Sequence, residues 1–374
     1  MKKILMLIRT PSLVYDDRVR KEVNTLQSNN SVIISAFENK QIPLTTEYKN
    51  ERVVVLRNEL KFRKIFPSGR FASLKLFEMY YRFICDYRKF KPDALWLHNF
   101  ESVGIVILFG VLKKLKFFRG QLIWDQHELP PNAFVKSPIL KSIYKLTLKL
   151  TDKNIHACDE RAIYINNKLK LNKHYEIIEN FPDQLFIKFK GSPINKEVEA
   201  WLNGEVFLLC QGGARSDRGF KEVVEAAITS SIKVVFIGPF DPKEVGKYKS
   251  LYSSFDKWVH MHASVPQLEL TSYIRLSSAS LVFYKKEHMN NWLCAPNRFY
   301  QALSLGKPVI SGNNPLFATY KVTEGVFVCD TDGNDTNEIV KGITRFLNDD
   351  LTTISNKCYW ESQEGKILNV VSAK

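Results

Sequence analysis

Residues 206–220 read VFLLCQGGARSDRGF and carry the pattern on which the fold prediction depends. Val206–Leu209 is a short apolar run, the pair Gly212-Gly213 follows it, and a helix is expected to begin near Lys221. A strand that is apolar on both faces and leads through a glycine loop into a helix is typical of a parallel sheet with helices on each side. The segment therefore predicts one βαβ unit of an α/β protein.

Runs of the same kind recur along the chain, separated by amphipathic stretches of helix length. The first series is Ile4–Ile8, Val32–Ile34, Val53–Leu56, Ala94–Leu97, Gln121–Trp124, Asn154–Ala157 and Glu176–Ile178. After the turn-like segment Asn180–Asp183, the second series is Val206–Leu209, Lys233–Ile237, Val259–Met261, Ser280–Phe283, Pro308–Ile310 and Val326–Val328. We therefore predict two doubly wound, Rossmann-like domains, residues 1–182 and 183–357, with a ligand cleft between them.

The composition is that of a globular protein, with 374 residues of which 45% are hydrophobic and 25% charged. Disordered, collagen-like and coiled-coil chains are therefore excluded. Fifty-four Lys and Arg against 39 Asp and Glu give a formal net charge of +15. This excess is either solvated or faces an anionic partner such as nucleic acid, a phosphorylated ligand or a lipid surface.

Several familiar motifs are absent from the sequence. There is no GxGxxG, no GxxxxGKS/T, no HExxH and no GxSxG, which disfavours an NAD enzyme in particular. The six cysteines form no CxxC pair and no Cys/His cluster with zinc spacing, so we expect reduced, mostly buried cysteines and no metal site. No apolar run suits a membrane span or a signal peptide, and the chain is expected to be cytoplasmic.

The loop between Gln211 and Phe220 is the main phosphate-binding candidate. Gly213 lets the backbone approach a ligand, the next helix offers free N–H groups, and Arg215 and Arg218 add forked donors for a diphosphate. The alternative is a glycine turn with solvated arginines. We prefer phosphate binding because arginine grips two phosphate oxygens at once and stabilises the charge that grows on a departing diphosphate.

Residues 295–310 predict a helix and then a strand. Pro296 suits the first helical turn, and Gly306 suits the position just after the helix end. Asn297 and Gln301 are one turn apart on one helix face, so both could meet the same ligand. The alternative is a solvated polar face.

Four parts of the chain, in a fixed order, resemble one enzyme family. They are Asp17–Glu22 after the first strand, His127-Glu128 after the fifth, Arg218-Gly219 after the first strand of the second half, and Pro296–Arg298 followed by Leu305–Val309. In order and spacing, over nearly the whole chain, they resemble the GT-B glycosyltransferases of family 4, in the subgroup with a Pro-Asn-basic motif.

The resemblance implies a GT-B fold and a retaining, metal-independent glycosyltransferase of the hexosyltransferase type, without a cofactor. Its N-terminal domain would hold the acceptor, a glycan or a lipid-linked glycan, and its C-terminal domain would hold a UDP-sugar or GDP-sugar donor. The expected role is the biosynthesis of a surface polysaccharide such as lipopolysaccharide. A C-terminal helix within residues 358–374 is expected to pack back on the first domain, with Trp360 as a packing residue.

The resemblance also assigns roles to individual residues. The catalytic residues would be His127, near the reacting sugar carbon, and Arg218, on the diphosphate; the alternative for His127 is a satisfied interior ring. The donor-binding residues would be Gly213, Arg215, Arg218, Asn291, Pro296, Asn297, Arg298 and Gln301. The acceptor side would contain Asp17, Arg18, Glu22, His98 and Glu128.

The sequence departs from the family at its pair of glutamates. Gln301 replaces the glutamate that accepts from the ribose hydroxyls, and Leu293 replaces the one that touches the donor sugar. An amide still accepts a hydrogen bond from a hydroxyl, and Asn290 or Asn291 is the expected substitute for the other glutamate. These departures support one alternative, a non-catalytic nucleotide-binding or glycan-binding scaffold of the same fold. A second alternative is a nucleotide-sugar epimerase, which would have a similar two-domain shape.

Three basic clusters lie in the first half of the chain. Lys61–Lys91 has nine Lys or Arg against two acidic residues and is rich in aromatic residues. The other clusters are Lys113, Lys114, Lys116 and Arg119, and Lys141, Lys145, Lys149 and Lys153. Such mixtures on amphipathic helices suit an anionic lipid interface and predict peripheral binding to the inner face of the cell membrane. The alternative is a solvated basic surface; nucleic acid is disfavoured because no nucleic-acid-binding module is recognisable.

Overall fold

The computed structural model describes residues 1–66, 71–349 and 358–372, and the chain divides into two compact units. The first unit contains Met1–Glu179 together with the C-terminal segment from Gln363, and the second contains Asn180–Ser362. Residues 67–70 of the basic segment 61–91 and residues 373–374 of the C-terminal segment lie outside the described part.

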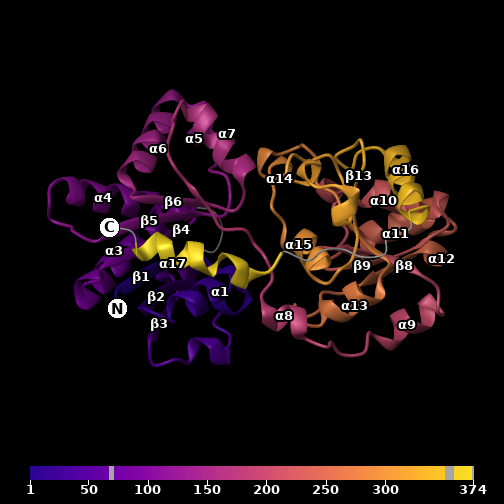
Figure 1. Cartoon of the computed structure of the whole chain (residues 1–374), viewed down its shortest axis with the longest axis horizontal. Helices are drawn as coiled ribbons and strands as arrows, with labels where there is room; N and C mark the ends of the chain where they lie inside the picture. The colour runs from indigo at the N-terminus through magenta and orange to yellow at the C-terminus, as the bar shows by residue number, and fades with distance from the viewer. Residues whose placement is uncertain (67–70, 350–357, 373–374) are drawn as a thin grey trace. The chain divides into compact units, whose positions relative to one another are not determined.

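The first unit is built on a seven-stranded parallel sheet with the strand order β3-β2-β1-β4-β5-β6-β7 (Figure 1). Its strands are β1 Lys3–Thr10, β2 Ser31–Glu38, β3 Val53–Asn58, β4 Ala94–His98, β5 Gln121–Gln126, β6 Lys153–His156 and β7 Glu176–Ile177. Each coincides with a predicted apolar run. The order reverses between β1 and β4, which is the place where ligands of doubly wound sheets bind.

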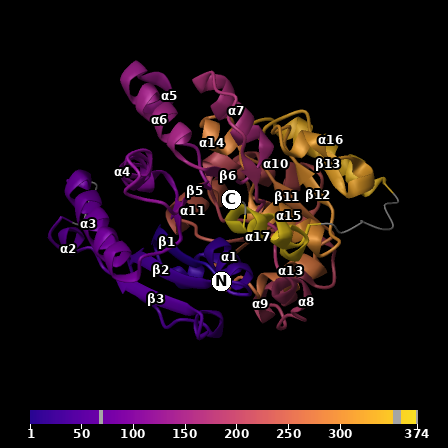
Figure 2. The same ribbon diagram turned by 60° about the vertical axis from the view of Figure 1, so that its left-hand side comes forward.

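Two layers of helices cover this sheet. On one face lie α3 (Ala72–Phe90), α4 (Val103–Lys114), α6 (Pro138–Leu150) and α7 (Asp159–Leu169), which share one hydrophobic core with side chains of β1, β4 and β5 (Figure 2). On the other face α17 (Glu364–Ser372) packs on α1 (Asp17–Leu26). Short helices complete the unit: α2 Lys61–Ile65, α5 Ala133–Lys136, and 3-10 turns at Leu13–Tyr15, Thr46–Tyr48 and Phe100–Ser102.

The second unit has a six-stranded parallel sheet with the order β10-β9-β8-β11-β12-β13. Its strands are β8 Phe207–Gln211, β9 Lys233–Ile237, β10 Val259–His262, β11 Ala279–Val282, β12 Val309–Ser311 and β13 Val326–Val328. Its helices are α8 Gln184–Lys188, α9 Lys196–Leu202, α10 Phe220–Thr229, α11 Pro242–Leu251, α12 Phe255–Trp258, α13 Leu270–Leu276, α14 Met289–Trp292, α15 Asn297–Ser304 and α16 Thr336–Leu347. The strand order reverses between β8 and β11, which marks the expected ligand position of this unit.

Several local predictions can be compared with the structure. Helix α10 begins at Phe220, one residue before the predicted start. Gly306 follows the end of α15 with φ +69°, as predicted, whereas Pro296 precedes the helix as its extended N-cap instead of lying in the first turn. All six cysteines are free, and five of them are buried. None of the described helices combines the length and the hydropathy needed to cross a bilayer.

Candidate functional site

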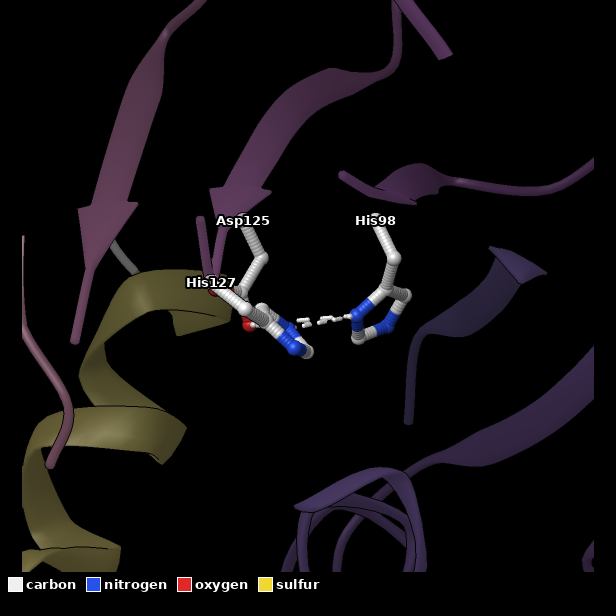
Figure 3. A group of neighbouring side chains, drawn as sticks. All are labelled: His98, Asp125 and His127. Carbon is white, nitrogen blue, oxygen red and sulfur yellow. Dashed lines mark hydrogen bonds and ion pairs between the residues drawn. The ribbon is translucent and has the colours of Figure 1, made fainter. Parts of the chain in front are cut away.

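In the first unit, polar side chains gather where β4 and β5 end, beside the reversal of the strand order. His98 closes β4, Asp125 lies opposite it on β5, and His127 follows β5 directly. Arg18 and Glu22, one turn apart on α1, complete this group, which we call the histidine cluster. Figure 3 shows the two imidazoles pointing toward one another, with Asp125 beside His127.

The two histidines are coupled to each other and to the carboxylate of Asp125. Nδ1 of His98 lies 3.1 Å from Nε2 of His127, and the ring planes are nearly perpendicular at 88°. Nε2 of His127 is also 3.4 Å from Oδ2 of Asp125. Burial lowers the pKa of His98 to about 3, so this ring is neutral at pH 7. His127 stands at the edge of the cluster, with 17% of its side chain exposed.

A buried guanidinium neutralises the cluster. Nη2 of Arg18 lies 3.0 and 3.1 Å from the two oxygens of Asp125, and its Nε lies 2.9 Å from Glu22. Burial disfavours the charged form of Asp125, but Arg18 and His127 outweigh it and hold its pKa well below the usual range. Burial and the charge of Asp125 raise the pKa of Glu22 well above normal. Arg18 therefore balances Asp125, and of the two carboxyl groups Glu22 is the one that is easier to protonate.

His98, Asp125 and His127 are also close enough to share a metal ion, since one ligand atom of each lies within 4.8 Å of the others. Two imidazoles and one carboxylate are a donor set that suits zinc or iron. However, Oδ2 of Asp125 already accepts from Arg18, so a cation here would meet the positive charge of the guanidinium. The spacing fits a metal, and the local charge opposes one.

The other predicted acceptor-side residues are spread around this cluster. Asp17 pairs with Arg20 and Lys21, at 2.7 Å in each case. Burial alone would raise the pKa of Asp17, but these two cations lower it to about 2. Glu128 is exposed. Of the acceptor-side candidates, Arg18, Glu22 and His98 are buried, so they can act on a ligand only through a neighbour such as His127.

In the second unit, the glycine loop after β8 is held against the neighbouring strand β9. Gly212 and Gly213 have φ of +102° and +74°, so the left-handed backbone requires glycine at both positions. Both of their N–H groups donate to the carbonyl of Ile237, at 2.7 and 3.1 Å. These amides are therefore used inside the fold and are not free for a phosphate.

The main feature of this site is a pair of arginines, Arg218 and Arg298, at the reversal between β8 and β11. Arg218 donates to the carbonyl of Gly212 at 3.2 Å, and Arg298 donates to the carbonyls of Gln211 and Phe283. Both guanidiniums lie against the Tyr284 ring, with their Cζ atoms 5.5 and 4.4 Å from its centroid.

No carboxylate of the described residues is in ion-pair contact with the arginine pair, although the charge of Asp217 is felt by Arg218. Among the described residues neither Arg218 nor Arg298 forms an ion pair, and the Nε of each is buried without a hydrogen-bond partner. Burial and the charge of Arg298 lower the pKa of Arg218. Two half-buried or buried cations whose close contacts are carbonyls and a ring favour an anionic ligand between them.

Arg215 differs from Arg218 although the sequence analysis grouped them. It is half exposed and pairs with Asp217 at 2.9 and 2.7 Å. Asp217 also accepts from Asn291 at 3.1 Å. Because Asp217 already neutralises Arg215, the cationic partner of Arg218 is Arg298.

The remaining donor-side candidates lie on α15 and just before it. Asn297 is exposed, and Pro296 is half-buried, whereas Gln301 has only 5% of its surface exposed. Sharing one helix face therefore does not give Asn297 and Gln301 the same access to a ligand. Sequence reasoning missed Tyr284, whose signal was its position directly after the apolar run of β11.

Gly213 provides a first test of the loop. A Cβ built on it would lie 1.9 Å from the carbonyl oxygen of Pro239, in addition to the strain of φ +74°. We expect Gly213→Ala to lower the free energy of unfolding by about 2 kcal/mol or more, measured by urea denaturation. Gly246→Ala is the matched control, because nothing lies within 4 Å of its Cβ and it sits in helix α11, where alanine is favoured. Equal effects of the two changes would contradict the assigned loop geometry.

Comparison with known proteins bears on the fold. No sequence-family model matches the chain, and no curated protein sequence matches it significantly. A sucrose-phosphate synthase from Thermosynechococcus elongatus has a TM-score of 0.69 at 14% identity, over 100% of this chain and 94% of that chain. A trehalose 6-phosphate synthase from Burkholderia multivorans gives 0.69 at 11% identity, over 100% and 95%. HepE from Anabaena, solved with UDP-glucose, gives 0.61 at 10% identity, over 99% and 95%.

These neighbours are GT-B glycosyltransferases, and they match the present chain over both parallel-sheet units. The predicted GT-B fold is thereby confirmed. At such low identity the likeness concerns the fold alone, and it does not single out family 4. The family, the donor, the acceptor and the site residues stay predictions.

Proposed function

We propose that this chain is a retaining glycosyltransferase that transfers a hexose from a UDP-sugar or GDP-sugar to a glycan or lipid-linked glycan, as a member of family 4. The observation that carries the proposal is the uncompensated arginine pair, Arg218 and Arg298, at the strand-order reversal of the second unit. The fold class of the neighbours agrees with this, and HepE has been solved with UDP and with UDP-glucose.

The arginine pair suits the departure of a nucleoside diphosphate. When the bond between the sugar and the diphosphate breaks, negative charge grows on the phosphate oxygens. Guanidiniums that are already held in place, as Arg298 is by the carbonyls of Gln211 and Phe283, stabilise this charge without reorganisation. Asn291, Pro296 and Asn297 would contact the donor sugar beside the arginine pair. Arg215 and Gly213 would support the loop between Gln211 and Phe220.

The histidine cluster would serve the acceptor side in this proposal. His127 is its exposed member and would bind a sugar hydroxyl, while the buried His98, Asp125, Glu22 and Arg18 fix its ring. Because Arg18 supplies the positive charge beside Asp125, the cluster needs no metal, and we propose a metal-independent reaction. The lipid-linked acceptor and the net charge of +15 suggest a place on the inner face of the cell membrane, in surface polysaccharide assembly.

Binding of nucleoside diphosphates is the direct test. UDP or GDP at about a hundred times its Kd is expected to stabilise the protein by about 2.7 kcal/mol, which raises the melting temperature by roughly 5–11 °C for a unit of this size. UMP and uridine, which lack the diphosphate, are the matched control ligands and should shift it much less. If no nucleoside diphosphate shifted the melting temperature, the proposal would be refuted.

Turnover separates the remaining interpretations. The transferase consumes a UDP-sugar or GDP-sugar only when an acceptor is present and retains the anomeric configuration. Conversion of the donor alone to another sugar nucleotide would indicate an epimerase. Binding without turnover across a panel of acceptors would indicate the non-catalytic scaffold.

A further inference from the structure

Helices α3, α4 and α6 cover the same side of the first sheet (Figure 2), and we call their outer sides together the α3–α4–α6 face. Helices α3 and α4 are joined through Tyr80, whose hydroxyl donates to the carbonyl of Glu101 at 2.6 Å and accepts from the N–H of Gly104 at 3.2 Å. Helices α4 and α6 approach closely at Gly110, which lies against Leu150. The inner sides of all three helices belong to the same core, so their outer sides face away from the sheet together.

The outer side of this face is rich in large apolar side chains. At the α4 end, Leu115 is 59% exposed and Phe117, in the loop after it, is 77% exposed. Ile139 at the start of α6 is 73% exposed. The others with more than a third of their surface exposed are Leu74, Phe77, Tyr81, Leu108, Val111, Ile143 and Leu146. A monomer in water rarely gathers so many exposed apolar side chains on neighbouring helices without a partner.

The same face is strongly cationic. Residues 103–151, which include α4 and α6, contain only two acidic residues. They are Asp125, which is buried, and Glu128, which is exposed. The cations of this segment are Lys113, Lys114, Lys116, Arg119, Lys136, Lys141, Lys145 and Lys149. Of these, only Lys113 has an acidic partner among the described residues, which is Asp152. Apart from Lys153, which lies on β6 and pairs with Glu176, two of the three basic clusters of the sequence thus lie on α4, on α6 and in the loop after α4.

A cavity of about 740 Å³ borders this face where α3 and α4 end. Tyr87 and Phe118 form its aromatic wall, and their ring centroids are 6.0 Å apart. Lys91 and Arg119 line it, and neither has an acidic partner among the described residues. A cationic cavity with an aromatic wall beside exposed apolar residues suits the phosphate of a lipid headgroup.

We propose that the α3–α4–α6 face docks on an anionic lipid bilayer, with Leu115, Phe117 and Ile139 entering the boundary with the acyl chains and the lysines contacting lipid phosphates. This deepens the membrane association of the proposed function and rests on that part of it, not on the donor chemistry. A second copy of the chain is disfavoured as the occupant because it would bring the same unpaired cations face to face. Nucleic acid is disfavoured because the exposed side chains are mostly aliphatic and offer little surface for base stacking.

Vesicle flotation tests the proposal. The full chain is expected to float with vesicles of equal parts phosphatidylglycerol and phosphatidylcholine, and at least tenfold less with pure phosphatidylcholine. The apolar variant Leu115→Ser/Phe117→Ser/Ile139→Ser and the charge variant Lys114→Glu/Lys141→Glu/Lys149→Glu should each lose at least tenfold of the binding. Five of the six side chains are exposed and Lys141 is half-buried, and the three lysines have no ion-pair partner in the described chain, so folding should be preserved.

The second unit offers a matched control. Val206, Leu251 and Leu276 are exposed by 64, 66 and 58%, similar to the three apolar residues of the face. The variant Val206→Ser/Leu251→Ser/Leu276→Ser should float like the wild type. Equal flotation on neutral and anionic vesicles, or an equal loss in the control, would overturn the proposal. A second outcome would also overturn it: light scattering shows that the wild type is a dimer and that the apolar variant is a monomer. The face would then be a protein interface.

Failure here and failure of the proposed function are distinguishable. The melting-temperature shift with UDP or GDP depends on the second unit alone and should be the same in wild type and in the apolar variant. If the protein binds nucleotide but no vesicle, the docking proposal is refuted and the transferase proposal is not. If it floats but binds no nucleotide, the transferase proposal is refuted and the docking proposal is not.

Discussion

Arg218→Ala is expected to lower turnover by about 10²–10³-fold, the usual cost of removing one preorganised charge-stabilising donor. The same variant should no longer be stabilised by UDP or GDP. Arg218 is half-buried beside Arg298 without an acidic partner in the described chain, so its charge is available to a ligand. Turnover with a sugar nucleotide and acceptor, and thermal shift with the diphosphate, are the two measurements.

The ligand-free protein supplies a second signature of this prediction. Because Arg218 and Arg298 repel one another, removing Arg218 should leave the stability without nucleotide unchanged or increased. A residue with only a structural role would lower it. Arg218→Lys keeps the charge but loses the planar fork, so it should recover part of the activity.

Arg215→Ala is the matched control for Arg218→Ala. Both side chains are guanidiniums of the same loop, but Asp217 already pairs with Arg215. We therefore expect the control to change turnover by no more than a few-fold. If Arg215→Ala removed nucleotide binding and Arg218→Ala did not, the diphosphate would lie elsewhere.

The sequence was sufficient for the fold because the strands are buried on both faces. A run such as Ile4–Ile8 or Lys233–Ile237 has no polar face, and both became central strands, β1 and β9. The helix end at Gly306 was also readable, because a left-handed residue after a helix favours glycine. Pro296 was placed one residue too far into its helix, since the fixed φ of proline suits the N-cap as well as the first turn.

The site was harder to predict because its geometry depends on contacts between distant segments. Arg215 and Arg218 both lie within two residues of Asp217 in the sequence, and only the fold shows that Asp217 pairs with Arg215 and that Arg298 lies near Arg218. The pairing of Arg18 with Asp125 spans 107 positions and has no local signal. The amides of Gly212 and Gly213 bind the carbonyl of Ile237 at the end of the adjacent strand β9, a contact between segments that the sequence does not signal.

Arg18→Met is expected to lower the stability of the first unit by about 3–5 kcal/mol, the usual cost of leaving a buried charge without its partner. Arg18 has 6% of its side chain exposed and Asp125 none, so water cannot replace the lost hydrogen bonds. Hydrogen exchange of β4 and β5 during urea unfolding reports on this unit separately. Lys341→Met, which removes an exposed pair with Glu338, is the control and should change stability by less than about 1 kcal/mol.

The double variant Arg18→Met/Asp125→Asn tests whether the charge is the cause. Removing both charges leaves a neutral amide in place of the unpaired carboxylate, so the double variant should be more stable than Arg18→Met alone. If the stability loss of the double variant equalled the sum of the losses of Arg18→Met and Asp125→Asn, the two residues would not act as a pair.

Arg18 also decides whether the histidine cluster accepts a metal. The donor atoms of His98, Asp125 and His127 are spaced for a metal ion. With the guanidinium removed, the negative charge of Asp125 is no longer compensated and is available to a cation. Zinc is therefore expected to raise the melting temperature of Arg18→Met and to leave that of the wild type unchanged. The opposite result, with zinc stabilising the wild type, would mean that the cluster is a metal centre, and the proposal of a metal-independent reaction would have to be abandoned.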